Sequence, residues 1–559
     1  MQISPRVTYP TSTEVDFVIV GSGAAGGVMA KELSTRGFSV VVLEQGPRID
    51  PARFEHDEFK YLFHNGISNP SPVSWRKTEQ EEARVGGGEL LYARLVGGSS
   101  VHFTANFWRL HEIDFHERSR LGGIPGADLQ DWPISYADLE PYYTKVEWEV
   151  GVSGEPGPFD PPRSRPYPLP PMPNKSAGVL FERGARKLGL NPQSAPVAIL
   201  SRPFNGRNAC QHCGYCMQFG CEYGAKSSSL AAMIPVAEAT GRCEIRPNSY
   251  ARKVELDARG RAVGVIYFDA ERREQLQRAK AVVLCANGAE TPRLLLMSKS
   301  NRFPDGLANS SGRVGKTLMF NVGAGAMGRF EHPLNEYRSI QVTRLSHDFY
   351  DSDPKRGFYG GGGIDARFQR YPITWALGGL ADTAPQWGSE YKRMVGEYFN
   401  RSMLLAGHTT SLPVPQNSIS LDPKAKDAWG LPAIRVTYND HPDDIRISQF
   451  LLDRSMEILD AAGAQEKWVD YPAETATFTA HLLGTCRMGK DPKTSVIDPD
   501  HRTHDVRNLF LCDGSSMVTS GRGQPTMTIM ALAFRAGERI AGLAGRGEIW
   551  IRGAVGGER

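Results

Sequence analysis

The glycine run Gly21-Ser-Gly23-Ala-Ala-Gly26 constrains the fold of this chain more than any other feature. Glycines at this spacing let backbone N–H groups approach a pyrophosphate at the N-terminus of a helix. The flanking residues predict, in order, a buried strand at 16–20, a helix at 27–35 and a second strand at 38–43. Glu44 ends the second strand, where a carboxylate accepts hydrogen bonds from ribose hydroxyls. The stretch therefore predicts a dinucleotide-binding unit rather than an ordinary tight turn.

The glycine run alone does not distinguish FAD from NAD. Two later stretches do, AVVLCANGAETPRLLL at 281–296 and NLFLCDGSSMVTS at 508–520. Both begin as apolar strands, and the second strand ends at Asp513-Gly514. A nucleotide-binding strand near the N-terminus and a final strand that ends in Asp-Gly fit a flavin fold closed by both ends of the chain. We therefore expect an α/β protein that binds FAD.

Composition excludes several classes of partner. The 559 residues include 65 basic and 62 acidic side chains, and the net charge of +3 gives no support for a nucleic-acid partner. No apolar stretch approaches the ~18 residues that a membrane-spanning helix needs. The N-terminal residues lack the pattern of a signal peptide. We expect a cytoplasmic protein, or a periplasmic one that is exported together with a partner.

Half of the eight cysteines lie in CQHCGYCMQFGC, with the spacing C-x2-C-x2-C-x4-C. Disulfides, a zinc site and an iron–sulfur cluster could each explain this crowding. Disulfides would close strained small loops, and zinc usually takes two separated pairs of ligands. Short, even spacing on a glycine-rich loop favours an iron–sulfur cluster of three or four irons. The predicted ligands are Cys210, Cys213, Cys216 and Cys221, with His212 as a neighbour or a substitute ligand.

The sequence resembles the glucose–methanol–choline (GMC) oxidoreductases. The likeness rests on the glycine run and on RLVGGSSVHFTANFWR at 94–109, PQNSISLDPKAKDAWGLP at 415–432 and the stretches HLLGTCRMGKDP and GQPTMTIMALAFRAGERI near the C-terminus. Within the family the chain looks similar to bacterial FAD-dependent sugar dehydrogenases such as glucoside 3-dehydrogenase catalytic subunits. The resemblance implies FAD and the oxidation of a sugar or glycoside hydroxyl, at C3 for example, by hydride transfer to the flavin.

The family resemblance also implies a divided architecture. The fold would be α/β, with a Rossmann-like FAD-binding domain and an inserted α+β substrate-binding domain that carries an antiparallel sheet. The FAD-binding part is expected at 1–125, 225–330 and 476–559, the substrate-binding part at 126–224 and 331–475, and the iron–sulfur loop at 205–226. The proline-rich residues 154–175 predict an extended surface linker, and 358–365 predict a glycine-rich loop, either a lid over the flavin or a surface turn.

His481 stands where the family carries its catalytic histidine, and an imidazole suits the removal of a hydroxyl proton. Family members usually have His or Asn before the last helix, whereas this chain has Gln524. An amide can hold a substrate hydroxyl but cannot act as a second base, so we expect His481 to take the proton alone. Pro525 and Thr526 would open that helix with its positive end toward the flavin.

The stretch GGSSVHFTAN is expected to lie along the flavin ring. Gly97, Gly98 and Ser99 would let the backbone approach the ring closely, and His102 would contact it. In pyranose oxidases the histidine of a similar stretch is bonded to the flavin, whereas we expect His102 to make a contact without that bond. Asn106 and Arg109 are further candidates for the same surroundings, and Gly514 follows Asp513 at the end of the last strand.

A one-electron cluster is useful when the electron acceptor is another protein. We therefore expect a dehydrogenase that works with a small signal-bearing subunit and a cytochrome c-type acceptor. The alternatives are an oxygen-using sugar or alcohol oxidase with a structural cysteine loop, a lyase that keeps FAD structurally, and a non-catalytic electron carrier.

Overall fold

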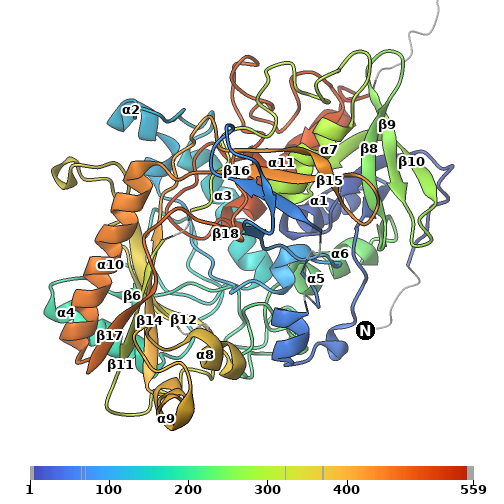
Figure 1. Cartoon of the computed structure of the whole chain (residues 1–559). Helices are drawn as coiled ribbons and strands as arrows, with labels where there is room; N and C mark the ends of the chain where they lie inside the picture. Colours follow the sequence, from blue (N-terminus) through green and yellow to red (C-terminus); the bar gives the residue numbers. More distant parts are fainter. Residues whose placement is uncertain (1–5, 65, 69–70, 322, 368–369, 551–559) are drawn as a thin grey trace, which may run out of the picture.

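A computed structural model describes residues 6–64, 66–68, 71–321, 323–367 and 370–550. Its largest layer is a seven-stranded sheet (Figure 1), in which parallel β7, β2, β1, β10 and β19 are followed by antiparallel β9 and β8. The strands are β1 (Val15–Val20), β2 (Val40–Leu43), β7 (Cys243–Arg246), β8 (Tyr250–Leu256), β9 (Ala262–Phe268), β10 (Glu274–Leu284) and β19 (Leu509–Leu511). The predicted α/β class is confirmed.

Both ends of the chain complete this sheet. β1 pairs with β10, which also pairs with β19 from the C-terminal region. Helix α1 (Ala24–Ser34) packs against α11 (Thr526–Gly545), and α11 packs against α3 (Tyr136–Val150). The valines and isoleucines of β1 and β2 are almost fully buried, as expected for parallel strands covered by helices. The predicted βαβ unit is present, and α11 begins at Thr526, one residue after Pro525.

A second, antiparallel sheet has six strands in the order β17-β11-β14-β13-β12-β6. Helices α10 (Pro442–Ala462) and α4 (Ser176–Lys187) cover one of its faces (Figure 1). The strands are β6 (Gln193–Ser194), β11 (Gly325–Arg329), β12 (Val342–Ser346), β13 (Gly362–Arg367), β14 (Ser402–Thr409) and β17 (Glu466–Tyr471). The alternation of side chains along β13 points Ile364 and Ala366 at the helices, so Asp365 and Arg367 face the other way.

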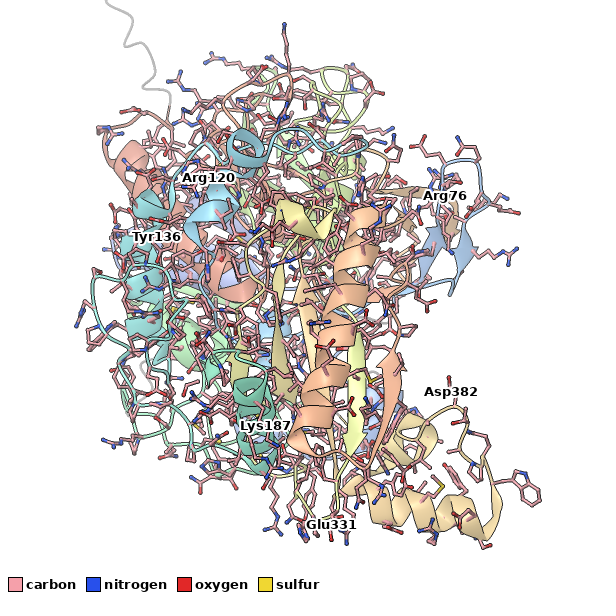
Figure 2. The ribbon with its side chains drawn as sticks, turned by 90° about the vertical axis from the view of Figure 1, so that its left-hand side faces the viewer. Arg76, Arg120, Tyr136, Lys187, Glu331 and Asp382 are labelled. Atoms are coloured by element: carbon pink, nitrogen blue, oxygen red, sulfur yellow. The ribbon has the colours of Figure 1, made fainter. Side chains whose placement is uncertain are left out.

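Smaller elements complete the fold. A four-stranded sheet contains β15 (Ser418–Lys426), β16 (Pro432–Thr437), β3 (Val73–Arg76) and β4 (Arg84–Val85), and β18 (Phe478–Thr479) pairs with β5 (Glu89–Leu90). The short helices are α2 (Glu117–Leu121), α5 (Ser229–Ala232), α6 (Ile234–Ala239), α7 (Asn287–Met297), α8 (Pro372–Gly378) and α9 (Gly388–Phe399). Figure 2 shows the segment around Asp382, between α8 and α9, standing out from the body of the molecule. None of the helices in the described ranges has the length and apolarity to cross a bilayer.

The predicted loop at 358–365 is wrong in its second half, because β13 begins at Gly362. Backbone proximity explains the glycines. A Cβ on Gly361 would lie 1.8 Å from the carbonyl oxygen of Tyr350, and one on Gly362 would lie 2.0 Å from that of His408. The glycine run therefore permits close strand packing instead of providing a flexible lid.

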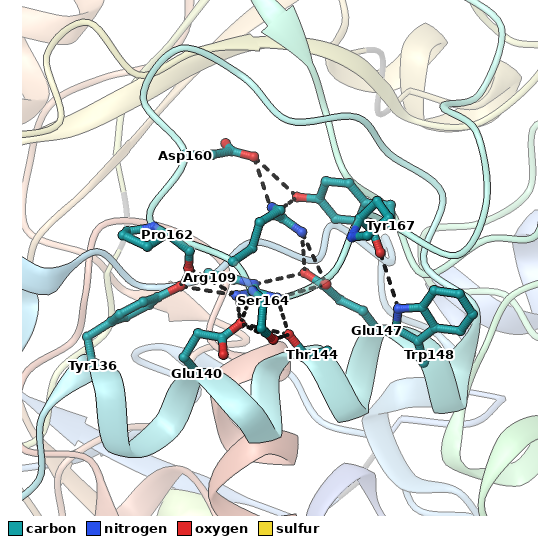
Figure 3. A network of polar contacts seen from close by, with 12 residues as sticks. Arg109, Tyr136, Glu140, Thr144, Glu147, Trp148, Asp160, Pro162, Ser164 and Tyr167 are labelled. Carbon is teal, nitrogen blue, oxygen red and sulfur yellow. Dashed lines mark hydrogen bonds and ion pairs between the residues drawn. The ribbon is translucent and has the colours of Figure 1, made fainter.

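The proline-rich segment 154–175 contains no helix or strand, as predicted, but it is fastened to α3 (Figure 3). Arg109 makes this attachment. Its guanidinium donates to both carboxylate oxygens of Glu147, at 2.9 and 2.8 Å, and to the carbonyl oxygen of Pro162. Arg163 adds a 3.1 Å ion pair to Glu147. Arg109 is therefore a structural residue rather than the flavin neighbour that the sequence indicated.

Candidate active site

Four parallel strands bring their carboxyl ends to one edge of the seven-stranded sheet. The glycine turn follows β1, Glu44 follows β2, Asn287 follows β10 and Asp513 follows β19. These residues line a cavity of about 760 Å³ that continues to the face of the antiparallel sheet opposite α10 and α4. Ligands bind outside the carboxyl ends of the strands in open α/β sheets, so the cavity lies where a dinucleotide is expected.

The glycine turn is built for close backbone approach. A Cβ on Gly26 would lie 1.9 Å from the carbonyl oxygen of Gly21, and one on Gly98 would lie 2.7 Å from Cα of Gly23. Gly98 also has φ +54°, in the left-handed region that favours glycine. The glycines therefore bring two turns, one from each stretch that the sequence singled out, into contact beside the cavity.

Ser22 and Glu44 join these turns. The hydroxyl of Ser22 accepts from Gly97 N at 3.0 Å and donates to Glu44 Oε2 at 2.8 Å. Glu44 Oε1 accepts from Gly46 N. Burial raises the pKa of Glu44, although these hydrogen bonds oppose the rise. Glu44 therefore fixes the glycine turn and still lines the cavity, where a ribose would lie.

Asp513 stabilises the same edge of the seven-stranded sheet at the end of β19. Its carboxylate accepts from Ser515 N at 2.8 Å, from Asn287 N at 3.1 Å and from Thr291 Oγ1 at 2.6 Å. Burial raises its pKa, and the same hydrogen bonds counter this effect. The carboxylate thus ties the end of β19 to the start of α7. Gly514, which follows it, also lines the cavity.

His102 and Asn106 carry buried polar atoms without partners. Nε2 of His102 and both amide atoms of Asn106 have no hydrogen bond among the described residues. Burial and, to a smaller extent, the nearby Lys226 ammonium together lower the pKa of His102 to about 3. Both side chains line the cavity together with Ser99. Unpaired polar atoms, a glycine cradle and the N-terminus of α11 fit a bound flavin.

His481 and Gln524 lie together in the wall between the two halves of the cavity. Nδ1 of His481 is 2.9 Å from Oδ1 of Asn321. Burial lowers the pKa of His481 to about 4, and the hydrogen bonds of the imidazole to Gln524 and Asn321 only partly oppose this change. The imidazole is therefore neutral over the physiological pH range and can accept a proton.

Asn321 determines which nitrogen of His481 carries the proton. Its amide nitrogen donates to the carbonyl oxygens of Thr409, at 2.5 Å, and Gly521, at 3.0 Å. Since carbonyl oxygens only accept, the amide oxygen must be the atom that faces His481. Nδ1 then carries the hydrogen, which leaves the lone pair of Nε2 free for a substrate proton. Asn321 is not among the residues predicted from the sequence. Its φ of +57°, typical of Asn and Asp among non-glycine residues, is not visible as a motif.

The loop before Gln524 is anchored by a buried ion cluster. Arg522 is fully buried and lies 2.5 Å from an oxygen of Asp114 and 2.7 Å from an oxygen of Glu117. Burial raises the pKa of Glu117 to about 7, against the attraction of Arg522. Thr519 adds a hydrogen bond to the Asp114 carbonyl. These contacts hold Gln524 in place just before α11.

The cysteine loop lies beside His102, and its residues Met217 and Gln218 line the cavity. The backbone N–H of Gln218, within the loop, donates to the His102 carbonyl at 2.6 Å. Burial raises the pKa of Cys216 to about 12, and neighbouring thiols Cys210, Cys213 and Cys221 contribute. All four cysteines are free. Among the described residues, however, no three His, Cys, Asp or Glu side chains are placed to hold a metal ion.

His212, the neighbour in that loop, is exposed. Its Nδ1 lies 2.8 Å from the hydroxyl of Ser339. The backbone of this loop is shaped by left-handed residues, with φ +57° at His212 and +94° at Gly214. The four thiols therefore lie on a tightly turned loop that contacts His102 through Gln218 and Ser339 through His212.

The fold and the cavity are those expected of a flavin-dependent oxidoreductase. Two family models, both described as GMC oxidoreductase, match residues 15–321 and 413–533. The chain belongs to the GMC oxidoreductase family, whose members are FAD-dependent enzymes acting on CH–OH groups.

Individual relatives agree with this assignment. The chain is 33% identical to 2-methyl-1,2-propanediol dehydrogenase of Mycolicibacterium austroafricanum, over 95% of this chain and 96% of that protein. It is 31% identical to the fructose dehydrogenase large subunit of Gluconobacter japonicus, over 94% and 97% of the two chains. Pyridoxine 4-oxidase from Mesorbium loti shares the fold, with a TM-score of 0.63, 17% identity and coverage of 94% and 98%. The narrower likeness to glucoside 3-dehydrogenases stays a prediction.

Proposed function

We propose that this protein is a dehydrogenase that oxidises a hydroxyl of a sugar or glycoside to a carbonyl. The observation that carries the proposal is the neutral His481 beside Gln524, with its tautomer fixed by Asn321. The relatives named above include dehydrogenases for fructose and for a small diol, which supports a hydroxylated substrate.

Each side chain has a defined part in this reaction. Nε2 of His481 accepts the hydroxyl proton while the C–O bond becomes a carbonyl. The amide of Gln524 holds the substrate oxygen and carries no proton away. When bound, FAD supplies the acceptor for the hydride that leaves the same carbon. The glycine cradle, Glu44 and Asp513 would hold the cofactor, and the N-terminus of α11 would face it with positive potential.

Anaerobic mixing with a panel of sugars tests the proposal. Bleaching of the flavin absorbance by at least one sugar, lost in His481→Ala at unchanged FAD content, is the expected result. Flavin that stays oxidised with every sugar and alcohol offered would contradict it. A lyase that retains FAD structurally would give that second result.

We further propose that the cysteine loop holds an iron–sulfur cluster that passes electrons to a protein acceptor such as a cytochrome c. Lys226 supports this. Its ammonium is buried and donates to the carbonyl oxygens of Phe103, Cys216 and Phe219, with no carboxylate partner among the described residues. A buried cation without an anion is costly, and cluster thiolates nearby would balance it. The four thiols would have to move closer together when the cluster binds.

Iron and acid-labile sulfide analysis with electron paramagnetic resonance tests the cluster. Three or four irons per chain, lost in Cys213→Ser, are expected. Flavin without iron would instead favour the alternative, an oxygen-using oxidase with a structural cysteine loop. One observation favours this alternative: among the described residues, no three His, Cys, Asp or Glu side chains are placed to bind a metal ion. Stoichiometric peroxide formation would establish it.

A small signal-bearing subunit is part of the same proposal. One relative is named as a large subunit, which supports assembly with a second chain. Export in complex with that subunit would place the enzyme in the periplasm, and without it the enzyme would stay in the cytoplasm. Fractionation of cells that express the chain with and without its partner distinguishes these locations. We also propose the division into FAD-binding and substrate-binding parts stated above.

A further inference from the structure

The substrate half of the cavity has an unusual balance of charge. The face of the antiparallel sheet opposite α10 and α4 contributes Arg367 from β13, and Arg370 and Asp470 also line the cavity. Among the described residues that line the cavity, Arg367 and Arg370 are the only arginines or lysines. These two guanidinium groups therefore decide whether a negatively charged substrate can be held.

Arg367 is already neutralised. Its Nε and Nη2 donate to the two carboxylate oxygens of Asp365, a residue with no exposed surface. Burial opposes the charge of Asp365, but Arg367 and His408 hold its pKa below the usual value. A bidentate pair of this kind uses the fork geometry with which arginine would otherwise bind a substrate carboxylate.

Arg370 is neutralised in the same way by Asp470. Nη2 of Arg370 lies 2.7 Å from Oδ1 of Asp470, whose side chain is only 5% exposed. One further charged residue lines this half of the cavity, the exposed Glu474, which has no ion-pair partner among the described residues. The two arginines thus carry no free positive charge, and the uncompensated charge at the rim is negative.

This balance distinguishes neutral from anionic substrates. The remaining N–H groups of the two arginines can donate to hydroxyl oxygens at no cost in net charge. A carboxylate would lose its hydration without gaining an unpaired cation, and removing such a charge from water is expensive. We propose that the two ion pairs, Arg367–Asp365 and Arg370–Asp470, form a hydroxyl-binding subsite that accepts neutral sugars and polyols and rejects the acids derived from them. The proposal rests on the proposed function.

Matched substrate pairs test this selectivity. Anaerobic flavin reduction would be measured with neutral sugars and with their acids, for example D-glucose with D-gluconate and a methyl glucoside with the glucuronoside. We expect kcat/KM for the neutral member to exceed that for the acid at least 100-fold. An acid that reduces the flavin as well as its neutral partner would overturn the inference and leave the proposed oxidation intact. If neither member of any pair reduces the flavin, the proposed function itself fails.

Two variants make the charge argument specific. Asp470→Asn frees Arg370, so kcat/KM for the acid should rise about tenfold while that for the neutral sugar falls. Glu474→Gln, at an exposed position where folding is not at risk, should raise kcat/KM for the acid by a smaller factor. Asp382→Asn, on the distant projection between α8 and α9 (Figure 2), is the control and should change neither value. Inhibition constants of the acid against a neutral substrate give a second readout. Equal effects on both substrates would contradict the proposal.

Discussion

Asn321 is the position where the proposed mechanism is most open to refutation. In Asn321→Leu the side chain keeps its approximate volume but loses three hydrogen bonds, to His481 Nδ1 at 2.9 Å and to the carbonyl oxygens of Thr409 and Gly521. The imidazole is then free to place its hydrogen on Nε2, where it cannot accept the substrate proton.

The magnitude follows from the hydrogen bond to the imidazole. Leaving a buried donor unsatisfied costs about 1–3 kcal/mol. One factor of ten in rate corresponds to about 1.4 kcal/mol, so kcat/KM should fall by roughly 10–100-fold at pH 7. Since Asn321 does not belong to the dinucleotide edge, FAD content should stay unchanged. Anaerobic stopped-flow reduction of the flavin measures the rate directly.

Asn508 offers a matched control. It is fully buried, and its amide nitrogen donates to two carbonyl oxygens, those of Ala262 and Lys280, both at 2.7 Å. Its amide oxygen accepts from Ala262 N at 3.1 Å. Asn508→Leu therefore removes the same kinds of bond far from His481, and it should lower the melting temperature without a selective loss of rate. If both variants lose equal turnover, Asn321 does not act through the histidine tautomer.

Three further predictions concern pH and the cofactor. Because the base form of His481 exists above its lowered pKa of about 4, kcat/KM should stay level from pH 7 to 5 and fall only near pH 4; a fall centred at pH 6.5 would refute a buried base. Gly98→Ala should release FAD, because the new Cβ would lie 2.7 Å from Cα of Gly23. The control Gly37→Ala, also at positive φ but with no atom within 4 Å of the new Cβ, should keep its full flavin content. Equal flavin loss in both variants would show that backbone strain, and not the close approach, is responsible. Burial lowers the pKa values of His111 and His501 to about 3, so below pH 6.5 the unfolded chain binds more protons than the folded one. The free energy of unfolding should therefore decrease by roughly 1 kcal/mol per histidine for each pH unit toward pH 4. Calorimetry in which His501→Gln keeps the full pH slope would contradict this.

Much of the dinucleotide half could be predicted from the sequence, because its signals are local. The glycine turn, Glu44 and the last strand each combine a strand pattern with a special residue at its end. His481, Gln524 and His102 needed the family resemblance, yet the cavity brings all three to its wall. In these regions local pattern and tertiary structure agree.

The missed features depend on long-range contacts. The partners of Asn321 lie 88, 160 and 200 residues away, and no spacing in the sequence encodes them. Arg109 stands within a flavin-like motif, but its side chain points to carboxylates on α3. The glycine run before Asp365 resembles a flexible loop because a sequence pattern does not distinguish freedom from close packing. Substrate selectivity also depends on contacts between residues far apart in the sequence, so it could not be predicted from local patterns.

The closure of one sheet by both ends of the chain affects how the protein is made. β1 and β10 can pair once residue 284 has been synthesised, but β19 and α11, the helix that covers α1, come from residues 509–545. At roughly 5–20 residues per second, the first strand waits from about half a minute to almost two minutes for them. During that time the cofactor edge lacks Asp513 and Gln524. Flavin should therefore be captured tightly only after residues 509–545 have emerged from the ribosome, and a nascent chain stalled before residue 500 should bind chaperones instead.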